Sequence, residues 1–233
     1  MTDHGDSHSE QQNPFRISGL LAMTDGGGKD EHEPGAESAF LFVHPTEAYA
    51  EEIGRYRREF LDAGDHMDGC GPLRAYDDPK EYIAVCTKRS RLDSNEAPGG
   101  RAQQFLLVRQ ADHRLVGMAQ YRYDADPRFR IGYSVRPGER GKGYAKTVLR
   151  SLLAWLNAQG KAVAVIACEA SNEASRRVIL ACGGKEKEKC TYKGIDLLVF
   201  EIALTGKVKT DAEMPAAEDT LRSTNGGGSN ETV

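Results

Sequence analysis

A glycine-rich turn joins a predicted strand to a predicted amphipathic helix near the middle of the chain. The strand covers 130–135, and the turn from 136 to 145 reads Arg-Pro-Gly-Glu-Arg-Gly-Lys-Gly-Tyr-Ala. Apolar residues then recur at helical spacing until Gly160 ends the pattern: Ala145, Val148, Leu149, Leu152 and Leu156. Such a turn leaves backbone N–H groups open beside the positive end of a helix dipole, so it predicts an anion site, most often for phosphate.

Two well-known phosphate motifs do not fit this turn. A nucleotide P-loop starting at Gly138 would reach its second glycine at Gly143, but Tyr144 stands where lysine is required. The dinucleotide fingerprint has Lys146 in place of its last glycine. The turn therefore predicts a phosphate ligand held in some other way.

Composition places the chain among ordinary soluble proteins. Its 233 residues are 39% hydrophobic and 28% charged, which predicts one domain with tails. The longest apolar run, 162–168, is far shorter than the roughly 20 residues of a membrane span, so no membrane partner is expected. Five cysteines without zinc spacing predict reduced thiols, no metal site and a cytoplasmic location.

Charge and small residues separate a core from two tails. Residues 1–38 carry a net charge of −6 and residues 206–233 a net −2, which leaves +4 of the total −4 for residues 39–205. Both tails are rich in glycine and polar residues, which predicts disorder, with one domain over 39–205. A core with so little positive charge and no basic stripe predicts no nucleic-acid partner.

The remaining pattern predicts an alternation of strands and helices. Asp78-Pro79-Lys80-Glu81 is typical of a helix start, and Thr46 is expected to cap the helix before it. The apolar run 162–168 predicts a strand buried on both faces. The predicted order is strand-helix-helix-strand-strand-strand-helix-strand-helix-strand-strand, with the strands at 39–43, 103–109, 115–123, 130–135, 162–168, 187–192 and 195–204.

Residues 140–145, Arg-Gly-Lys-Gly-Tyr-Ala, resemble the signature of the GNAT superfamily of N-acetyltransferases, Gln/Arg-x-x-Gly-x-Gly/Ala. The resemblance covers 39–204, including Asn172-Glu-Ala-Ser opening a helix that ends in Gly183-Gly184. A bacterial branch of predicted acetyltransferases shares the run 131–137, Ile-Gly-Tyr-Ser-Val-Arg-Pro. The resemblance implies an α/β (α+β) fold with a mixed, mostly antiparallel central sheet flanked by helices, and acetyl-CoA as co-substrate without a metal.

The resemblance also implies a coenzyme site between two parallel strands that splay apart. Backbone groups of 133–135 would bind the pantetheine arm, and N–H groups of 141–145 would hold the pyrophosphate, with charge from Arg140 and Lys142. Asn172 and Ser175 would contact the coenzyme beyond the second strand. The predicted coenzyme-binding residues are Tyr133, Ser134, Val135, Arg140, Gly141, Lys142, Gly143, Tyr144, Ala145, Asn172 and Ser175.

The catalytic groups are left open, because two positions depart from the family pattern. Many members carry a general-acid tyrosine seven residues after the helix-opening asparagine, where this chain has Ile179. Some carry a glutamate base five residues before that asparagine, where this chain has Ala167. Glu169 and Tyr192 are the candidates that remain, although surface exposure or packing is the commoner role for each. Cys168 is disfavoured as a nucleophile, since no histidine is placed to activate it.

The sequence contains little information about the acceptor substrate. In this fold the loop after the first helix borders the acceptor pocket, and here 62–70 is rich in carboxylates and holds His66. The loop would attract a cationic amine, or it is an ordinary polar surface loop. The predicted function is acetyl transfer from acetyl-CoA to a primary amine of a small molecule or protein. The alternative is a CoA-binding sensor or structural module without catalysis. The edge of the last hairpin offers a route to a homodimer.

Overall fold

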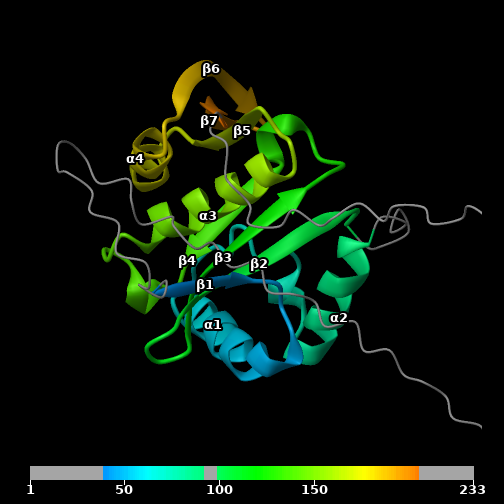
Figure 1. The fold of residues 1–233 in the computed structure, drawn as a ribbon. Coiled ribbons are helices and arrows are strands. Elements are labelled where there is room, and N and C mark those ends of the chain that lie inside the picture. The colour runs from blue at the N-terminus through cyan, green and yellow to red at the C-terminus, as the bar shows by residue number, and fades with distance from the viewer. Residues whose placement is uncertain (1–38, 92–98, 205–233) are drawn as a thin grey trace, which may run out of the picture.

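Two antiparallel sheets form the framework of the domain (Figure 1). The computed structural model describes residues 39–91 and 99–204, and the predicted tails lie outside these ranges. The first sheet has the order β1-β2-β3-β4, and its strands are β1 (Phe40–Val43), β2 (Ala102–Arg109), β3 (Arg114–Arg122) and β4 (Ile131–Val135). The second has the order β5-β7-β6, with β5 (Val163–Glu169), β6 (Lys185–Tyr192) and β7 (Ile195–Ala203).

Helices cover both faces of the first sheet (Figure 1). They are α1 (Ala50–Asp62), α2 (Pro79–Ser90), α3 (Tyr144–Ala158) and α4 (Glu173–Ala181). Alternate residues of β2 point to opposite faces, so the sheet separates two cores. Leu106 and Val108 pack with α1 and α2, whereas Phe105 and Leu107 pack with α3. The core around α3 continues into β5, α4 and β7, which fixes the second sheet to the first.

The predicted order of elements and the mostly antiparallel pairing are confirmed. The Asp78 side chain accepts a hydrogen bond from the Lys80 N–H at 2.8 Å, as expected of a helix cap. The expectation for Thr46 is wrong, because it precedes a 3-10 turn, Glu47–Tyr49, and makes no side-chain cap hydrogen bond. No helix in 39–91 or 99–204 is long and apolar enough to cross a membrane.

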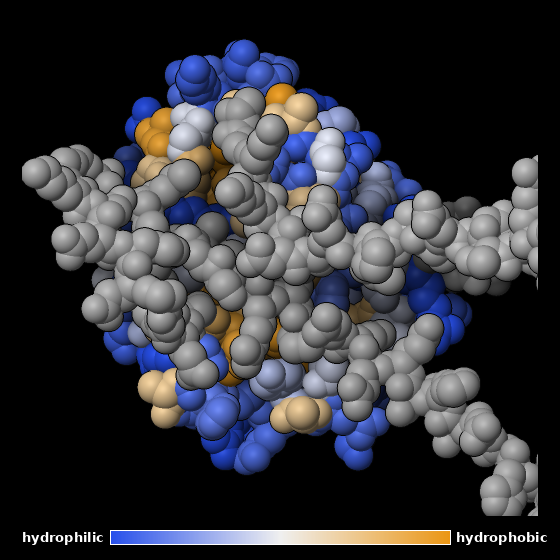
Figure 2. Space-filling view, in the orientation of Figure 1, coloured by the Kyte–Doolittle hydropathy of each residue, from blue (hydrophilic) through white to orange (hydrophobic). Residues whose placement is uncertain are grey.

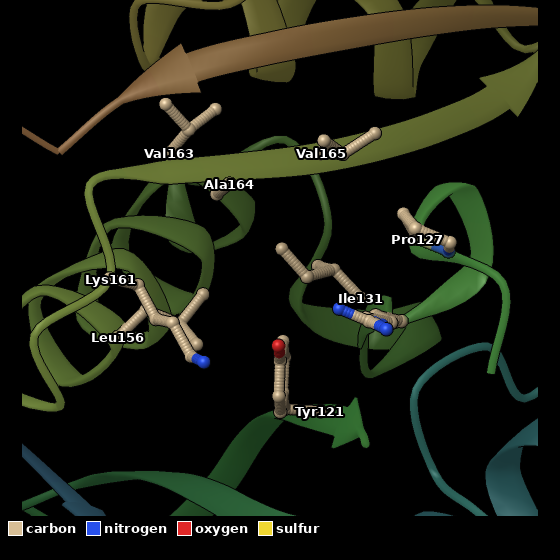
Figure 3. A pocket seen from close by; sticks show the side chains of 9 residues that line it. Tyr121, Pro127, Ile131, Leu156, Lys161, Val163, Ala164 and Val165 are labelled. Atoms are coloured by element: carbon tan, nitrogen blue, oxygen red, sulfur yellow. The ribbon is translucent and has the colours of Figure 1, made fainter. Parts of the chain in front are cut away.

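The prediction that both faces of β5 are buried is also wrong. Ala164 and Ile166 are buried against α3, but Val163 is 50% exposed. Figure 3 shows Val163 and Val165 on the side of β5 that points away from Tyr121, with Ala164 on the opposite side. Only one face of β5 therefore meets the core around α3, although the run is apolar on both faces.

The outer edge of the second sheet is strongly polar. Strand β6 begins Lys-Glu-Lys-Glu-Lys, and nearly all its residues are exposed. Figure 2 shows this part of the molecule, at the top of the view, as a hydrophilic surface. Charged residues on an edge strand oppose pairing with the edge of another sheet, so the predicted homodimer gains no support from this strand.

Strands β4 and β5 face each other as the edges of separate sheets. Their first residues, Ile131 and Val163, line a small cavity of about 60 Å³ (Figure 3). Toward their last residues, Val135 and Glu169, they line a cleft of about 1160 Å³. The two strands therefore run in the same direction and diverge, as the resemblance implied.

Candidate active site

The cleft between β4 and β5 has two chemically distinct ends. The α3 end is lined by the residues of the turn and the first helical residues between 139 and 146, except Lys142. The loop end is lined by residues 65–69, 71 and 72 after α1, by the polar side chains at the end of β3 and by Glu169 at the end of β5. One continuous space connects the two ends, so a long ligand at the α3 end can meet a second ligand at the loop end.

The backbone of β4 forms one wall of the cleft. Arg130 and Arg136, which flank the strand, are hydrogen bonded to β3. Bonded residues alternate along an antiparallel pair, so the N–H and C=O of Ser134 also face β3. The backbone groups of Tyr133 and Val135 face the cleft instead. Two of the three residues predicted to offer backbone hydrogen bonds are therefore oriented to do so, and Ser134 is not.

The turn before α3 has the open geometry that an anion requires. Gly141 and Gly143 have φ angles of +79° and +83°, in the region that favours glycine. A Cβ atom at either position would meet no heavy atom of residues 39–91 and 99–204 within 4 Å, so none of these residues fills the space beside the backbone. Gly143 is the N-cap of α3, and no side chain caps this helix. The first N–H groups of α3 thus remain accessible to a phosphate.

A buried carboxylate stabilises the turn. Glu139 is 4% exposed and forms ion pairs with Arg109 at 3.0 Å, Arg114 at 2.8 Å and Lys142 at 2.8 Å. Lys142 and Arg109 hold the pKa of Glu139 below its ordinary value. Lys142 is not among the residues that line the cleft, because its amine is directed to Glu139.

A second ion-pair cluster connects the turn to α1. Arg136 is 2% exposed, and its guanidinium lies 2.8 Å from carboxylate oxygens of both Glu52 and Glu59. It also donates to the carbonyl of Leu115 at 3.2 Å. These contacts fix where β4 ends and the turn begins.

Arg140 links the two ends of the cleft. Its Nη1 lies 2.6 Å from the Asp65 carboxylate, and its Nε donates to the Val135 carbonyl at 3.2 Å. The Arg140 guanidinium holds the pKa of Asp65 below its ordinary value. In this state the cation predicted to bind phosphate is engaged by a carboxylate of the loop end.

Strand β4 and helix α4 meet through a hydroxyl pair. The oxygens of Tyr133 and Ser175 are 2.9 Å apart, and burial raises the pKa of Tyr133. Asn172 caps α4 by accepting from the Ser175 N–H at 2.9 Å. The structure brings together along the cleft every predicted coenzyme residue except Lys142: Tyr133, Ser134, Val135, Arg140, Gly141, Gly143, Tyr144, Ala145, Asn172 and Ser175.

The two catalytic candidates have different positions. Glu169 lines the cleft, where its carboxylate raises the pKa of the nearby Asp68. Tyr192 does not line it: its side chain packs on Phe129 with ring centroids 4.7 Å apart, and it is 42% exposed. Glu169 is therefore the candidate that the structure brings to the site.

The departures from the family pattern have structural reasons. Ile179 is fully buried in the α3 core, and a Cβ at Gly184 would lie 2.6 Å from its side chain. A tyrosine at this position has no room to reach the cleft. Ala167 lines the cleft but carries no functional group. Burial raises the pKa of Cys168, which agrees with its exclusion as a nucleophile.

The acidic loop reaches the cleft, as the resemblance implied. Asp65, His66 and Asp68 line the loop end, and burial is the main cause that raises the pKa of Asp68. A side chain at Gly69 would overlap the backbone of Gly132 on β4, so glycine permits this close approach.

Sequence reasoning missed the polar side chains beneath this loop. Gln120 and Arg122 line the loop end from β3, and Gln104 on β2 donates to the Gly69 carbonyl at 2.8 Å. The signal was a polar residue at every second position after Met118, following the apolar residues 115–118 of the same strand. Alternation shows that these side chains share a face, but not what that face meets.

A buried polar contact was missed as well. The hydroxyl of Tyr56, on α1, lies 3.1 Å from Ser134 Oγ. The Cys70 thiol lies 3.2 Å from the same oxygen, and burial raises the pKa of Cys70 to about 12. The Ser134 side chain therefore joins α1 and the acidic loop to β4.

Solved structures with the same fold are numerous. Ribosomal-protein-S5-alanine acetyltransferase from Vibrio fischeri has a TM-score of 0.55 at 17% identity, covering 71% of this chain and 93% of that one. RimJ from Mycobacterium smegmatis, in complex with CoA-disulfide, has a TM-score of 0.53 at 18% identity, covering 70% and 81%. The acetyl-CoA complex of yncA from Salmonella typhimurium has a TM-score of 0.50 at 19% identity, covering 75% and 99%.

The sequence itself matches one family model. No curated protein matches the chain. The model of the acetyltransferase (GNAT) domain matches residues 44–185, which include β4, the glycine turn, α3, β5 and α4. This match covers more than half of the chain, and it agrees with the fold and with the open N-terminus of α3. The chain belongs to the GNAT family of acetyltransferases.

Proposed function

We propose that this protein is an acetyl-CoA-dependent N-acetyltransferase that acts on a primary amine. The observation that carries the proposal is the uncapped N-terminus of α3, with its two open glycines, at one end of a cleft between diverging strands. This arrangement suits a ligand with a pyrophosphate at the α3 end and a long arm along β4. A large anion and an extended arm are both features of acetyl-CoA, which also supplies the reactive thioester.

The coenzyme contacts that we propose follow from the orientation of the backbone. The N–H groups of residues 141–145 hold the pyrophosphate, and Tyr133 and Val135 bond the pantetheine arm. Arg140 contributes charge when it exchanges Asp65 for phosphate, and Lys142 contributes from outside the lining of the cleft. Asn172 and Ser175 complete the wall on the α4 side.

The loop end takes the acceptor in this proposal. A neutral amine attacks the thioester carbonyl: the N–C bond forms, the C–S bond breaks, the nitrogen loses a proton and the thiolate gains one. Glu169 accepts the amine proton directly or through water, since it is the candidate carboxylate that lines the cleft. Tyr192 has no part in this assignment.

The alternative is a CoA-binding module without catalysis. It is not favoured, because the chain belongs to an acetyltransferase family and the cleft extends beyond the coenzyme end. The cytoplasmic location and the homodimer stay predictions.

The test is acetylation by the full chain. Acetyl-CoA is mixed with a panel of polyamines, amino acids, amino acid amides and peptides, and mass spectrometry detects acetylated amine while thiol release gives the rate. We expect product well above the uncatalysed rate, reduced in Glu169→Gln but not in Glu173→Gln, an exposed α4 position paired with Arg176. Coenzyme binding without any acetylated product would support the inactive module instead.

A further inference from the structure

The loop end of the cleft contains a positive group as well as its carboxylates. Arg122, the last residue of β3, lines the cleft together with Gln120, which precedes it on the same face and is 4% exposed. Arg89, from the last turn of α2, is 5% exposed and lines the same end. Its guanidinium donates to the carbonyls of Gly99 and Gly100 at 2.7 and 2.8 Å.

Arg122 is incompletely satisfied. One terminal nitrogen donates to the Phe129 carbonyl, but its buried Nε has no hydrogen-bond partner within residues 39–91 and 99–204. Arg122 also forms no ion pair within those ranges, whereas two other arginines that line the cleft do. Arg128 is paired with Asp126 at 2.9 Å, and Arg140 is paired with Asp65 at 2.6 Å.

The surroundings of Arg122 disfavour a guanidinium without an anionic partner. Burial, followed by the charge of Arg89, lowers the pKa of Arg122. Asp68 acts in the opposite direction and is close enough to influence Arg122 electrostatically, yet the two side chains form no ion pair. A guanidinium presents several donors in a planar fork, so its natural partner is an anion with two oxygens.

We propose that the acceptor amine also carries an anionic group, a carboxylate or a phosphonate-like group, and that Arg122 binds this group at the loop end of the cleft. This inference rests on the proposed function and narrows its substrate class. The amino group lies toward Asp68 and Glu169, which line the same end of the cleft, and the anion lies toward Arg122. The site thus has charges of both signs for an acceptor of amino acid type.

The test compares acceptors that differ only in the anion. An amino acid, its amide and the corresponding aminophosphonic acid are acetylated by wild type, Arg122→Gln and Arg122→Lys. We expect kcat/KM in wild type to be about tenfold or more higher for an anionic acceptor than for the amide. Arg122→Gln should bring this ratio near one by raising KM for the anionic acceptor, and Arg122→Lys should restore part of it. The carboxylate and phosphonate arms show which anion the site prefers.

The matched control is Arg101→Gln. Arg101 also has a buried Nε without a hydrogen-bond partner in the described ranges, but it stacks on Tyr123 and does not line the cleft. The control should keep the wild-type ratio. A wild type that uses the amide as well as either anionic acceptor would overturn the inference and leave the acetyltransferase intact. Equal loss for all acceptors in Arg122→Gln would also overturn it. Absence of any acetylated amine would instead contradict the proposed function, and this inference with it.

Discussion

At the α3 end of the cleft, one continuous stretch from 136 to 145 supplies the glycines, the open helix N-terminus and a buried carboxylate. At the loop end, side chains come from the loop after α1, from α2, from β3 and from the end of β5. The first arrangement is local in sequence, whereas the second exists only after the sheets have assembled. We infer that the proposed phosphate contacts depend on one motif, whereas the proposed acceptor contacts depend on tertiary structure.

The largest expected loss of stability concerns the connection between the two ends. Arg136→Met leaves Glu52 and Glu59 without their buried cation, because the guanidinium is 2% exposed and 2.8 Å from each. We expect the free energy of unfolding to fall by about 3 kcal/mol, measured by urea denaturation. Lys80→Met, which breaks an exposed pair with Glu47, should change it by less than about 0.5 kcal/mol. Equal small effects would show that the Arg136 cluster does not stabilise the turn.

Removal of the buried Glu139 carboxylate tests the α3 end of the cleft alone. Glu139→Gln should lower the free energy of unfolding near neutral pH by about 1–3 kcal/mol, because three cations lose their partner. The folded-state pKa of Glu139 is depressed, so its stabilising effect is complete above the unfolded value of about 4.3 and is lost as pH falls through the folded-state value. Unfolding curves of wild type and variant should therefore converge in acid. Curves that stay parallel would contradict this account.

The next test concerns Ile179, the position at which the family resemblance implied a general-acid tyrosine. Ile179→Tyr should destabilise the protein by about 1–3 kcal/mol through overpacking, since Ile179 is fully buried against Gly184. We expect no gain in acetylation rate, because the ring cannot turn into the cleft without moving α4. A faster enzyme with unchanged stability would show that this position is open to the site.

We expect the smallest change in the free energy of unfolding for Asp68, at the loop end. Substitution of this residue should stabilise the protein, whereas the preceding substitutions destabilise it. Burial raises the pKa of Asp68, so the unfolded chain ionises first as pH rises, and the ionised residue destabilises the fold above about pH 4. Asp68→Asn should raise the free energy of unfolding at pH 8 by less than about 1 kcal/mol and leave it unchanged at pH 3. The same variant should weaken acceptor binding. A loss of stability at pH 8 would indicate that the carboxylate is structural.

The two ends also differ in how far sequence predicts them. Ten of the eleven predicted coenzyme residues line the cleft, because backbone geometry at a glycine turn is set by its own residues. The sequence did not predict the contact of Lys142 with Glu139 or the pairing of the Ser134 backbone with β3, because both depend on how the folded segments are placed. Arg122 and Gln120 were missed, because their role depends on a loop that is distant in sequence.

The same distinction between local and tertiary information explains the errors in the predicted fold. The order of elements followed from periodicity, which is local. The one-sided burial of β5 did not, because an apolar run does not reveal how many faces of its strand other elements cover. The cleft exists because the strands are divided into two sheets. The sequence pattern predicts the strands but does not show how they are divided between sheets.

The most direct test of the central claim is isothermal titration of acetyl-CoA into wild type, Ala145→Glu and Ala158→Glu. Ala145 lines the cleft in the first turn of α3, so a glutamate there places negative charge at the proposed phosphate site without requiring a positive φ. Ala158 is the last residue of the same helix and is exposed, so it receives the same substitution far from the site. The account predicts binding by wild type and Ala158→Glu, and affinity about tenfold or more lower in Ala145→Glu. Equal affinity in all three proteins would contradict phosphate binding at the N-terminus of α3.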